Sequence, residues 1–166
     1  TEEVEGFDCD TDFTSVYKKY ATPEELVEEA IEAWGAAVTR SVILTGGEPA
    51  LQVDEKLVDA FKEQGFFVAI ETNGTKELPP NIDWVSCSPK TAEHTLKLIY
   101  VDELRYVRGT RQGIPKPKLN AVHYYLSPAA ASDGVVEENL KWCLNLIEQN
   151  PSWKLSVQMH KLWQKR

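Results

Sequence analysis

The feature that most constrains the fold is an alternation of short apolar segments with an amphipathic helical pattern. The apolar segments 41–44 and 66–70 are four and five residues long, and a helical pattern at 54–64 lies between them. Short, almost wholly apolar strands that alternate with helices are typical of a parallel sheet buried on both faces and joined by right-handed crossovers. The sequence therefore predicts an α/β fold.

Two helices are predicted in the first half of the chain. The first is expected to begin at Thr22, a favourable N-cap followed by a proline and two acids, and to end near Gly35. The second is the pattern at 54–64, which Gly65 should stop. Its inward residues are predicted to be Leu57, Val58 and Phe61.

The second half should continue the same architecture. The segment 108–118 has two glycines and two prolines and is predicted to be a mobile surface loop. A last amphipathic helix is expected at 136–149. Its core-facing residues are predicted to be Leu140, Cys143, Leu144 and Ile147. Further strands are expected near 84–87, 103–107, 122–126 and 153–157.

Composition limits the classes of function. A chain of 166 residues that is 42% hydrophobic can bury a core, and a single domain over residues 1–166 is expected. The 26 acidic residues exceed the 18 basic ones, and a net charge of -8 argues against a nucleic-acid partner. No segment approaches the roughly 20 apolar residues of a membrane span, and the start of the chain lacks the features of a signal peptide. We therefore expect a cytoplasmic protein with no membrane partner and a small-molecule ligand.

Four polar segments directly follow predicted strands. They are Thr-Gly-Gly-Glu-Pro at 45–49, Glu-Thr-Asn-Gly-Thr at 71–75, Ser-Pro-Lys at 88–90 and Gln-Met-His-Lys at 158–161. The carboxyl ends of parallel strands lie at one edge of a sheet, and α/β folds bind ligands at that edge. The sequence predicts an active site there.

The first polar segment has the chemistry of an ammonium site. Gly46 and Gly47 allow a ligand to approach the backbone, Glu48 supplies an anionic acceptor and Pro49 fixes the following turn. A phosphate loop fits poorly, because Glu48 would repel phosphate and no Gly-Lys-Ser/Thr follows. The alternative interpretation is a plain tight turn.

The next two segments carry further candidates. Glu71 and Asn73 follow an apolar strand, and Gly74 permits a positive backbone angle; an ordinary Asn-Gly turn with a solvated acid is the alternative. Ser88 and Lys90 offer a hydroxyl and a cation to a carboxylate or a ribose, and a surface lysine is the alternative.

Gln158 and His160 lie two residues apart, so their side chains should share one face of an extended segment. A carboxamide and a neutral imidazole together suit the mixed donor and acceptor edge of a heterocycle. A lone histidine is more often structural, and we interpret His94 and His123 in that way.

The three cysteines are too few and too widely spaced for a disulfide framework. Cys9 suits a soft metal or an iron–sulfur cluster, although one cysteine cannot hold a cluster, whereas the neighbouring Asp10 and Thr11 suit Mg²⁺. Cys87 and Cys143 fall in a predicted strand and a predicted helix, and we assign both to packing.

Six segments together resemble the 7-carboxy-7-deazaguanine synthase family of the radical S-adenosylmethionine superfamily, from Cys9 nearly to the C-terminus. They are Cys-Asp-Thr-Asp-Phe, Thr-Gly-Gly-Glu-Pro, Glu-Thr-Asn-Gly-Thr, Ile-Asp-Trp-Val-Ser-Cys-Ser-Pro-Lys, Tyr-Tyr-Leu-Ser-Pro and Leu-Ser-Val-Gln-Met-His-Lys-Leu. The resemblance implies a partial, open parallel β/α barrel of the radical S-adenosylmethionine type. It also implies a lyase of queuosine and deazapurine biosynthesis, which converts 6-carboxy-5,6,7,8-tetrahydropterin to 7-carboxy-7-deazaguanine with loss of ammonia.

The resemblance also implies a set of cofactors and site residues. The cofactors are a 4Fe-4S cluster, S-adenosylmethionine and Mg²⁺; the cluster cleaves S-adenosylmethionine, and the resulting radical abstracts hydrogen from the pterin C6. Cys9 is expected to bind the cluster, Thr11 to bind Mg²⁺, and Gln158 and His160 to bind the pterin. The residues expected to bind S-adenosylmethionine are Gly46, Gly47, Glu48, Glu71, Asn73, Ser88, Lys90, Ser127 and Pro128. Of these, the first three should hold the methionine ammonium and the last two should lie near the adenine. A flavodoxin- or ferredoxin-type reductant and a homodimer are further expectations from the resemblance.

The start of this sequence departs from the family pattern. The family holds its cluster with three cysteines; Cys9 matches the third, and Gly6 stands where the second should be. We expect that residues before Cys9, including the first strand and the cluster loop, are missing from this sequence, because the later motifs are intact. Without those residues the chain would be inactive. The alternatives are a degenerate, cluster-free protein that binds S-adenosylmethionine or pterin, and a radical activase, which Gln158 and His160 disfavour.

Overall fold

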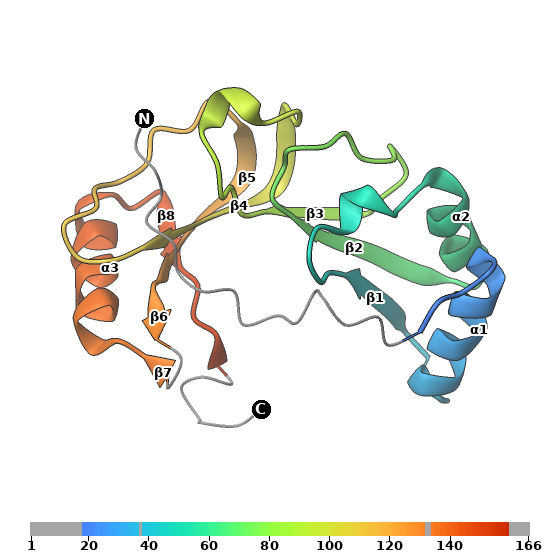
Figure 1. The fold of residues 1–166 in the computed structure, drawn as a ribbon. Coiled ribbons are helices and arrows are strands. Elements are labelled where there is room, and N and C mark those ends of the chain that lie inside the picture. The colour runs from blue at the N-terminus through green and yellow to red at the C-terminus, as the bar shows by residue number, and fades with distance from the viewer. Residues whose placement is uncertain (1–17, 37, 132–133, 160–166) are drawn as a thin grey trace.

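The fold is built on one parallel sheet. The computed structural model describes residues 18–36, 38–131 and 134–159. Six strands are ordered β1-β2-β3-β4-β5-β8 across the sheet, and each pairs with its neighbours in parallel (Figure 1). Their bounds are β1 Arg40–Leu44, β2 Phe66–Thr72, β3 Trp84–Cys87, β4 Tyr100–Arg108, β5 Asn120–Pro128 and β8 Trp153–Leu155. The prediction of an α/β fold with a parallel sheet is confirmed.

In the described part of the chain, three helices accompany the sheet: α1 (Pro23–Trp34), α2 (Glu55–Glu63) and α3 (Glu137–Gln149). Two short 3-10 helices, η1 (Pro49–Leu51) and η2 (Glu93–Thr95), lie in the connections. Both of the first two helices begin where the sequence predicts, because their N-cap side chains accept backbone N–H groups. The Thr22 hydroxyl accepts from Glu25 N, and the Asp54 carboxylate accepts from Leu57 N at 2.9 Å.

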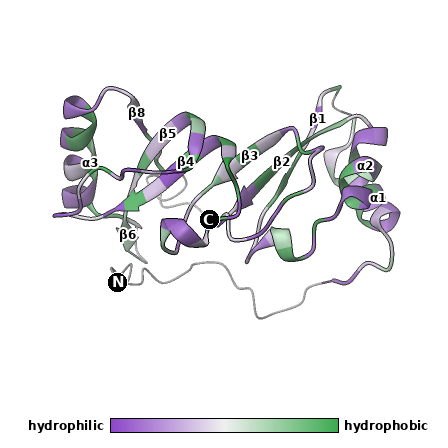
Figure 2. Ribbon diagram, turned by 90° about the horizontal axis from the view of Figure 1, so that it is seen from above, coloured by the Kyte–Doolittle hydropathy of each residue, from purple (hydrophilic) through white to green (hydrophobic). Residues whose placement is uncertain are grey.

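The helices cover only one face of the sheet, which we call the outer face, and they cover it at its two ends. In Figure 1, α1 and α2 lie beside β1 and β2, and α3 lies beside β5 and β8. Figure 2 shows that α3 turns its hydrophobic side to the sheet and its hydrophilic side away. The buried cluster between α1, α2 and β2 consists of Val27, Val58, Phe61, Phe66 and Val68. The cluster that includes α3 consists of Cys87, Val101, Leu104, Tyr106, Leu119, Leu126, Cys143 and Trp153.

The opposite, inner face carries the alternate side chains of each strand. On β2 the outer residues Phe66, Val68 and Ile70 are buried, whereas Phe67 is 46% exposed. Ile43, in register with Ala69 of β2, is 61% exposed. Among the described residues, no helix packs on this face near β1 and β2.

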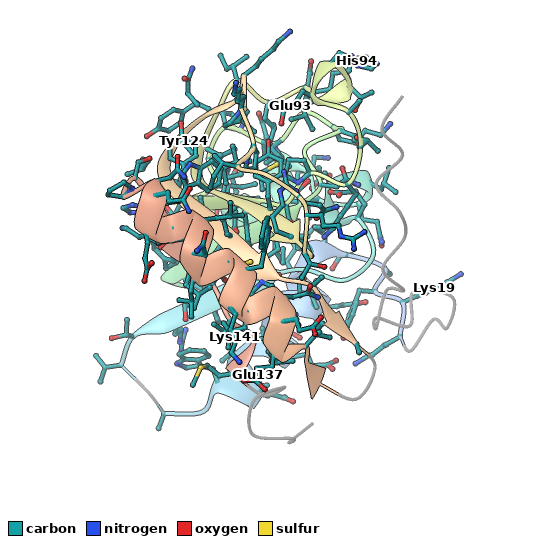
Figure 3. The ribbon with its side chains drawn as sticks, turned by 90° about the vertical axis from the view of Figure 1, so that its left-hand side faces the viewer. Lys19, Glu93, His94, Tyr124, Glu137 and Lys141 are labelled. Carbon is teal, nitrogen blue, oxygen red and sulfur yellow. The ribbon has the colours of Figure 1, made fainter. Side chains whose placement is uncertain are left out.

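A hydrogen-bonded connection covers the middle of the outer face. The Tyr106 hydroxyl donates to the Glu93 carboxylate of η2, and Lys118 N donates to the second oxygen of Glu93 at 3.3 Å. Figure 3 shows Glu93 and His94 together on this connection. Burial and the Glu93 carboxylate raise the pKa of Tyr106, so the phenol remains a donor.

Four details differ from the sequence prediction. Strands β4 and β5 are longer than expected, because they pair with each other over nearly their whole length although charged residues interrupt the apolar pattern. Strand β8 ends at Leu155 rather than at 157. The antiparallel pair β6 (Ala130–Ala131) and β7 (Gly134–Val135) has no apolar pattern and was not predicted. The prediction that Leu144 faces the core is wrong: Cys143 occupies the buried stripe, and Leu144, one position around the helix, is 43% exposed.

The loop 109–118 is held to α3. Thr110 N donates to the Asn139 side chain at 2.9 Å, and the Trp142 indole N–H donates to Gln112 O at 2.7 Å. The loop predicted at 108–118 begins at residue 109, because Arg108 ends β4, and these bonds hold it against the helix rather than leaving it mobile as predicted. Within the described residues, no helix has the length and apolar character needed to cross a lipid bilayer.

The carboxylate of Asp83 links α2 to the start of β3. One oxygen accepts from Val68 N at 2.8 Å, and the other accepts from the Lys62 ammonium at 2.7 Å. Burial opposes ionisation, but the two hydrogen bonds and the charge of Lys62 outweigh it and lower the pKa of Asp83.

We expect Asp83→Ala to lower the free energy of unfolding by about 1–3 kcal/mol, because it leaves the strand N–H of Val68 without its acceptor. Urea unfolding measures this change. Glu63→Ala, at an exposed position one residue beyond Lys62, is the matched control and should change stability by less than about 0.5 kcal/mol. Equal effects of the two substitutions would contradict this role of Asp83.

The stabilisation by Asp83 should depend on pH. Its folded pKa lies below the unfolded value of about 3.9, so the stabilisation is complete above that value and is lost as pH falls through the folded pKa. The stability difference between the unmodified protein and Asp83→Asn should therefore be larger at neutral pH than in acid. Urea titrations at several pH values test this, and a difference that grows in acid would have the wrong sign.

Candidate active site

The carboxylate of Glu48 joins the loop after β1 to the end of β2. Its Oε1 accepts from Ala50 N at 3.1 Å and from the Thr72 hydroxyl at 2.6 Å, and its Oε2 accepts from Asn73 N at 2.7 Å. The first two polar segments of the sequence are therefore brought together, as their predicted positions at one sheet edge required.

The loop retains capacity for a ligand. An ionised carboxylate offers about four acceptor positions, and three protein donors leave roughly one on Glu48. Gly46 has φ 121°, a backbone angle that L side chains rarely adopt, and nothing lies within 4 Å of the place where a Cβ would stand. An open backbone beside a partly satisfied carboxylate fits a ligand that carries an ammonium group.

Glu71 and Asn73 flank Thr72 in this junction. Glu71 is about half exposed, accepts from the Thr45 hydroxyl at 3.4 Å and forms an ion pair with Arg105 at 3.8 Å. The Asn73 oxygen accepts from both the N–H and the hydroxyl of Thr75, so the Asn-Gly turn foreseen as the plain alternative does form. Gly74 has φ 80°, and a Cβ there would stand 2.7 Å from the Cys87 sulfur.

Ser88 extends the same network to β3. Its N–H donates to Thr72 O at 2.8 Å, and its hydroxyl accepts from the Lys90 ammonium at 3.3 Å. The candidates at the ends of β1, β2 and β3 are thus linked by hydrogen bonds into one continuous group.

The remaining candidates come from the other end of the sheet. Ser127 is on the inner face in register with Val107, Pro128 is buried at the end of β5, and Gln158 is exposed three residues beyond β8. They belong to the same carboxyl edge because every strand of the sheet is parallel. His160, Cys9 and Thr11 lie outside the described residues.

The inner face also carries a group of residues that the sequence analysis did not single out. Arg105 of β4 donates to Glu103 at 3.2 Å and to the Ser86 hydroxyl at 3.5 Å. His123, interpreted from the sequence as ordinary, has its ring 6.1 Å from that of Trp84, and its Nδ1 is 3.4 Å from the Lys154 ammonium. One feature of the sequence could have revealed this group: Glu103 and Arg105 are two residues apart in a predicted strand, so their side chains share one face of the sheet.

The two described cysteines are unsuited to metal binding. Both are fully buried, as predicted for packing residues. Burial, helped by the charges of Glu48 and Glu93, raises the pKa of Cys87 to about 12, and burial raises the pKa of Cys143 to about 11. In the part of the chain that the structure describes, no three acidic, histidine or cysteine side chains are grouped to hold a metal ion.

Comparisons with known proteins agree with this architecture. The model of the radical SAM superfamily matches residues 9–113. The 7-carboxy-7-deazaguanine synthase of Bacteroides thetaiotaomicron is 39% identical over 141 residues, which are 85% of this chain and 71% of the relative. That of Bradyrhizobium diazoefficiens is 36% identical over 165 residues, with 92% and 75% covered.

A solved structure shares the fold. The crystal structure of QueE from Escherichia coli matches with a TM-score of 0.59 at 24% identity, and the match covers 83% of this chain and 64% of that one, slightly less than two thirds of its length. The superfamily model covers more than half of this chain, and the relatives are similar over most of their own length. The chain therefore belongs to the radical SAM superfamily and, within it, to the 7-carboxy-7-deazaguanine synthase family.

Proposed function

We propose that this chain is the catalytic domain, over residues 1–166, of an enzyme that converts 6-carboxy-5,6,7,8-tetrahydropterin to 7-carboxy-7-deazaguanine with release of ammonia. Sequence similarity to the 7-carboxy-7-deazaguanine synthases supports the reaction. The structural observation that carries the proposal is the Glu48 junction, where one carboxylate fixes two strand ends and keeps an acceptor position for a ligand.

The described residues fit S-adenosylmethionine. Its ammonium needs an anionic acceptor, which Glu48 offers. Its carboxylate needs a cation, which Lys90 offers, and its ribose needs hydrogen-bond partners, which Ser88 and Glu71 offer at the ends of adjacent strands. Together with the iron–sulfur cluster, S-adenosylmethionine supplies the radical that takes hydrogen from the substrate. This chain's residues bind and orient the two ligands at the carboxyl edge of the sheet.

Several parts of the proposal concern residues and partners beyond the described structure. Cys9 binds the cluster, Thr11 binds Mg²⁺ near the substrate carboxylate, and His160 joins Gln158 at the pterin. The enzyme is a cytoplasmic homodimer that receives electrons from a flavodoxin- or ferredoxin-type protein. These assignments follow the family resemblance.

A second candidate is a protein of this family that binds S-adenosylmethionine or pterin without a cluster. The observation in its favour is Gly6, which stands where the family places a second cluster cysteine. Anaerobic iron and sulfide analysis of the protein from its complete reading frame separates the two functions. About four irons per chain, and conversion of the tetrahydropterin with S-adenosylmethionine and a reductant, are expected from the enzyme; absence of iron favours the binding protein.

We expect Glu48→Ala to weaken S-adenosylmethionine binding at least about tenfold, because it removes the carboxylate that is proposed to accept from the ligand ammonium. Thr72→Val is the matched control: it removes one donor to Glu48 and keeps the charge, so it should weaken binding less. Isothermal titration calorimetry measures both affinities. An unchanged affinity in Glu48→Ala would exclude this residue from the cofactor site.

His160→Ala should chiefly weaken binding of the pterin, because the imidazole is proposed to read its heterocyclic edge. Isothermal titration calorimetry measures the affinity of both variants, His160→Ala and Glu48→Ala, for both ligands, 6-carboxypterin and S-adenosylmethionine. Each variant should affect one ligand much more than the other. Equal losses for both ligands in both variants would contradict the assignment of separate binding ends.

A further inference from the structure

The carboxamide of Asn139, in the first turn of α3, joins two separate loops. Its Oδ1 accepts from Thr110 N in the loop after β4 at 2.9 Å, and its Nδ2 donates to Ala129 O just after β5 at 2.8 Å. Helix α3 runs back along the sheet from β7, so its first turn lies at the carboxyl edge, where both of these strands end (Figure 1). One side chain of the helix therefore links the ends of two neighbouring strands.

The two partners fix the orientation of this carboxamide. Thr110 N can only donate and Ala129 O can only accept, so the side-chain oxygen must face the first and the amino group the second. An aspartate would lack the donor, and a leucine of similar size would lack both groups. Asparagine at position 139 therefore meets a requirement that comes from the two loops and not from the helix.

Ala129 is held through both of its backbone polar groups. It is 1% exposed, its N–H donates to Arg108 O at the end of β4 at 2.9 Å, and its carbonyl accepts the bond from Asn139. Ser127 and Pro128 directly precede it at the end of β5. The bond from Asn139 therefore sets the position of these two residues from their C-terminal side.

The loop after β4 has a second attachment to the same helix. Trp142, about one turn beyond Asn139, donates from its indole N–H to Gln112 O at 2.7 Å. Because Trp142 holds the next part of the loop, loss of the Asn139 carboxamide should release Thr110 and Ala129 locally without detaching the whole loop.

We propose that Asn139 is a positioning residue for the adenosine end of the S-adenosylmethionine site. By tying the ends of β4 and β5 to α3, it holds Ser127 and Pro128 where they contact the adenosine part of the ligand. This role rests on the proposed function and on the family resemblance, which places these two residues near the adenine. It adds a residue that belongs to none of the family motifs.

Asn139→Leu removes both hydrogen bonds at nearly constant volume. The probes are S-adenosylmethionine and 5′-methylthioadenosine, which lacks the ammonium and carboxylate of the methionine chain. In isothermal titrations of the holoenzyme without reductant, both should bind more weakly by about the same factor, roughly fivefold. The affinity for 6-carboxypterin should change less than about twofold. Glu48→Ala should show the opposite selectivity and weaken only the probe that carries the ammonium.

Asn139→Asp separates the two bonds. The carboxylate keeps an acceptor for Thr110 N but offers no donor to Ala129 O, so this variant should also weaken both adenosine probes. Hydrogen–deuterium exchange measures the attachment of the loop without any ligand. The Thr110 amide should exchange faster in Asn139→Leu and at the unmodified rate in Asn139→Asp. If Asn139→Leu failed to fold, Asn139→Asp would supply the affinity test.

Asn145→Leu is the matched control. Asn145 is exposed on the same helix and accepts from the Gln149 side chain, four residues further on, at 2.7 Å, so this bond stays within α3. Its loss should leave all three affinities and the exchange rate of the Thr110 amide unchanged.

The outcomes separate positioning from a general structural role. Equal losses for all three probes in the Asn139 variants would indicate a general loss of structure and would overturn the proposal. An unchanged affinity for 5′-methylthioadenosine would overturn it as well, because the adenosine end would not depend on Asn139. If the unmodified holoenzyme bound no S-adenosylmethionine, the proposed function would fail, whereas normal binding by the unmodified protein and by both variants would remove only the role of Asn139.

Discussion

The arrangement of the site depends on one carboxylate, that of Glu48. It accepts one hydrogen bond from Ala50 in its own loop and two from Thr72 and Asn73 at the end of β2, which lie 24 and 25 residues further along the chain. The bonds require the register in which Leu44 lies opposite Ile70, because a slip of one residue would turn the side chain of Thr72 to the other face. The same carboxylate therefore ties the loop after β1 to the end of β2.

The two faces of the sheet are stabilised by different interactions. The outer face is apolar and packs in two clusters, one with α1 and α2 and the other with α3. The inner face carries charged and polar side chains that compensate one another, with Arg105 between Glu71 and Glu103. Such a face is tolerable because its charges are partly paired and partly solvated. The outer face thus carries the buried apolar clusters, whereas polar and charged side chains gather on the inner face.

Elements with strong caps and a clear apolar period were predicted from the sequence more accurately than elements without them. α1 and α2 were predicted almost to the residue, since Thr22 and Asp54 are strong caps and the apolar stripe repeats at helical spacing. β4 was predicted too short, because Asp102 interrupts the apolar pattern near its start, while its side chain accepts a hydrogen bond across the sheet from Val85 N. Leu144 was misplaced because its hydrophobicity does not reveal which side of α3 the sheet covers.

The sequence by itself determined the fold class and the chemistry of the strand ends, because strand length, helix caps and the identity of polar residues after each strand are local properties. It also revealed the family, since the motifs occur in a fixed order. Only the tertiary structure decided which side chains meet. It showed that Glu48 is an internal acceptor for Thr72 and Asn73, and that Arg105, Tyr125 and Lys154 form one row. These contacts join separate strands, so they depend on register and sheet order, which are set by the packing of the whole sheet.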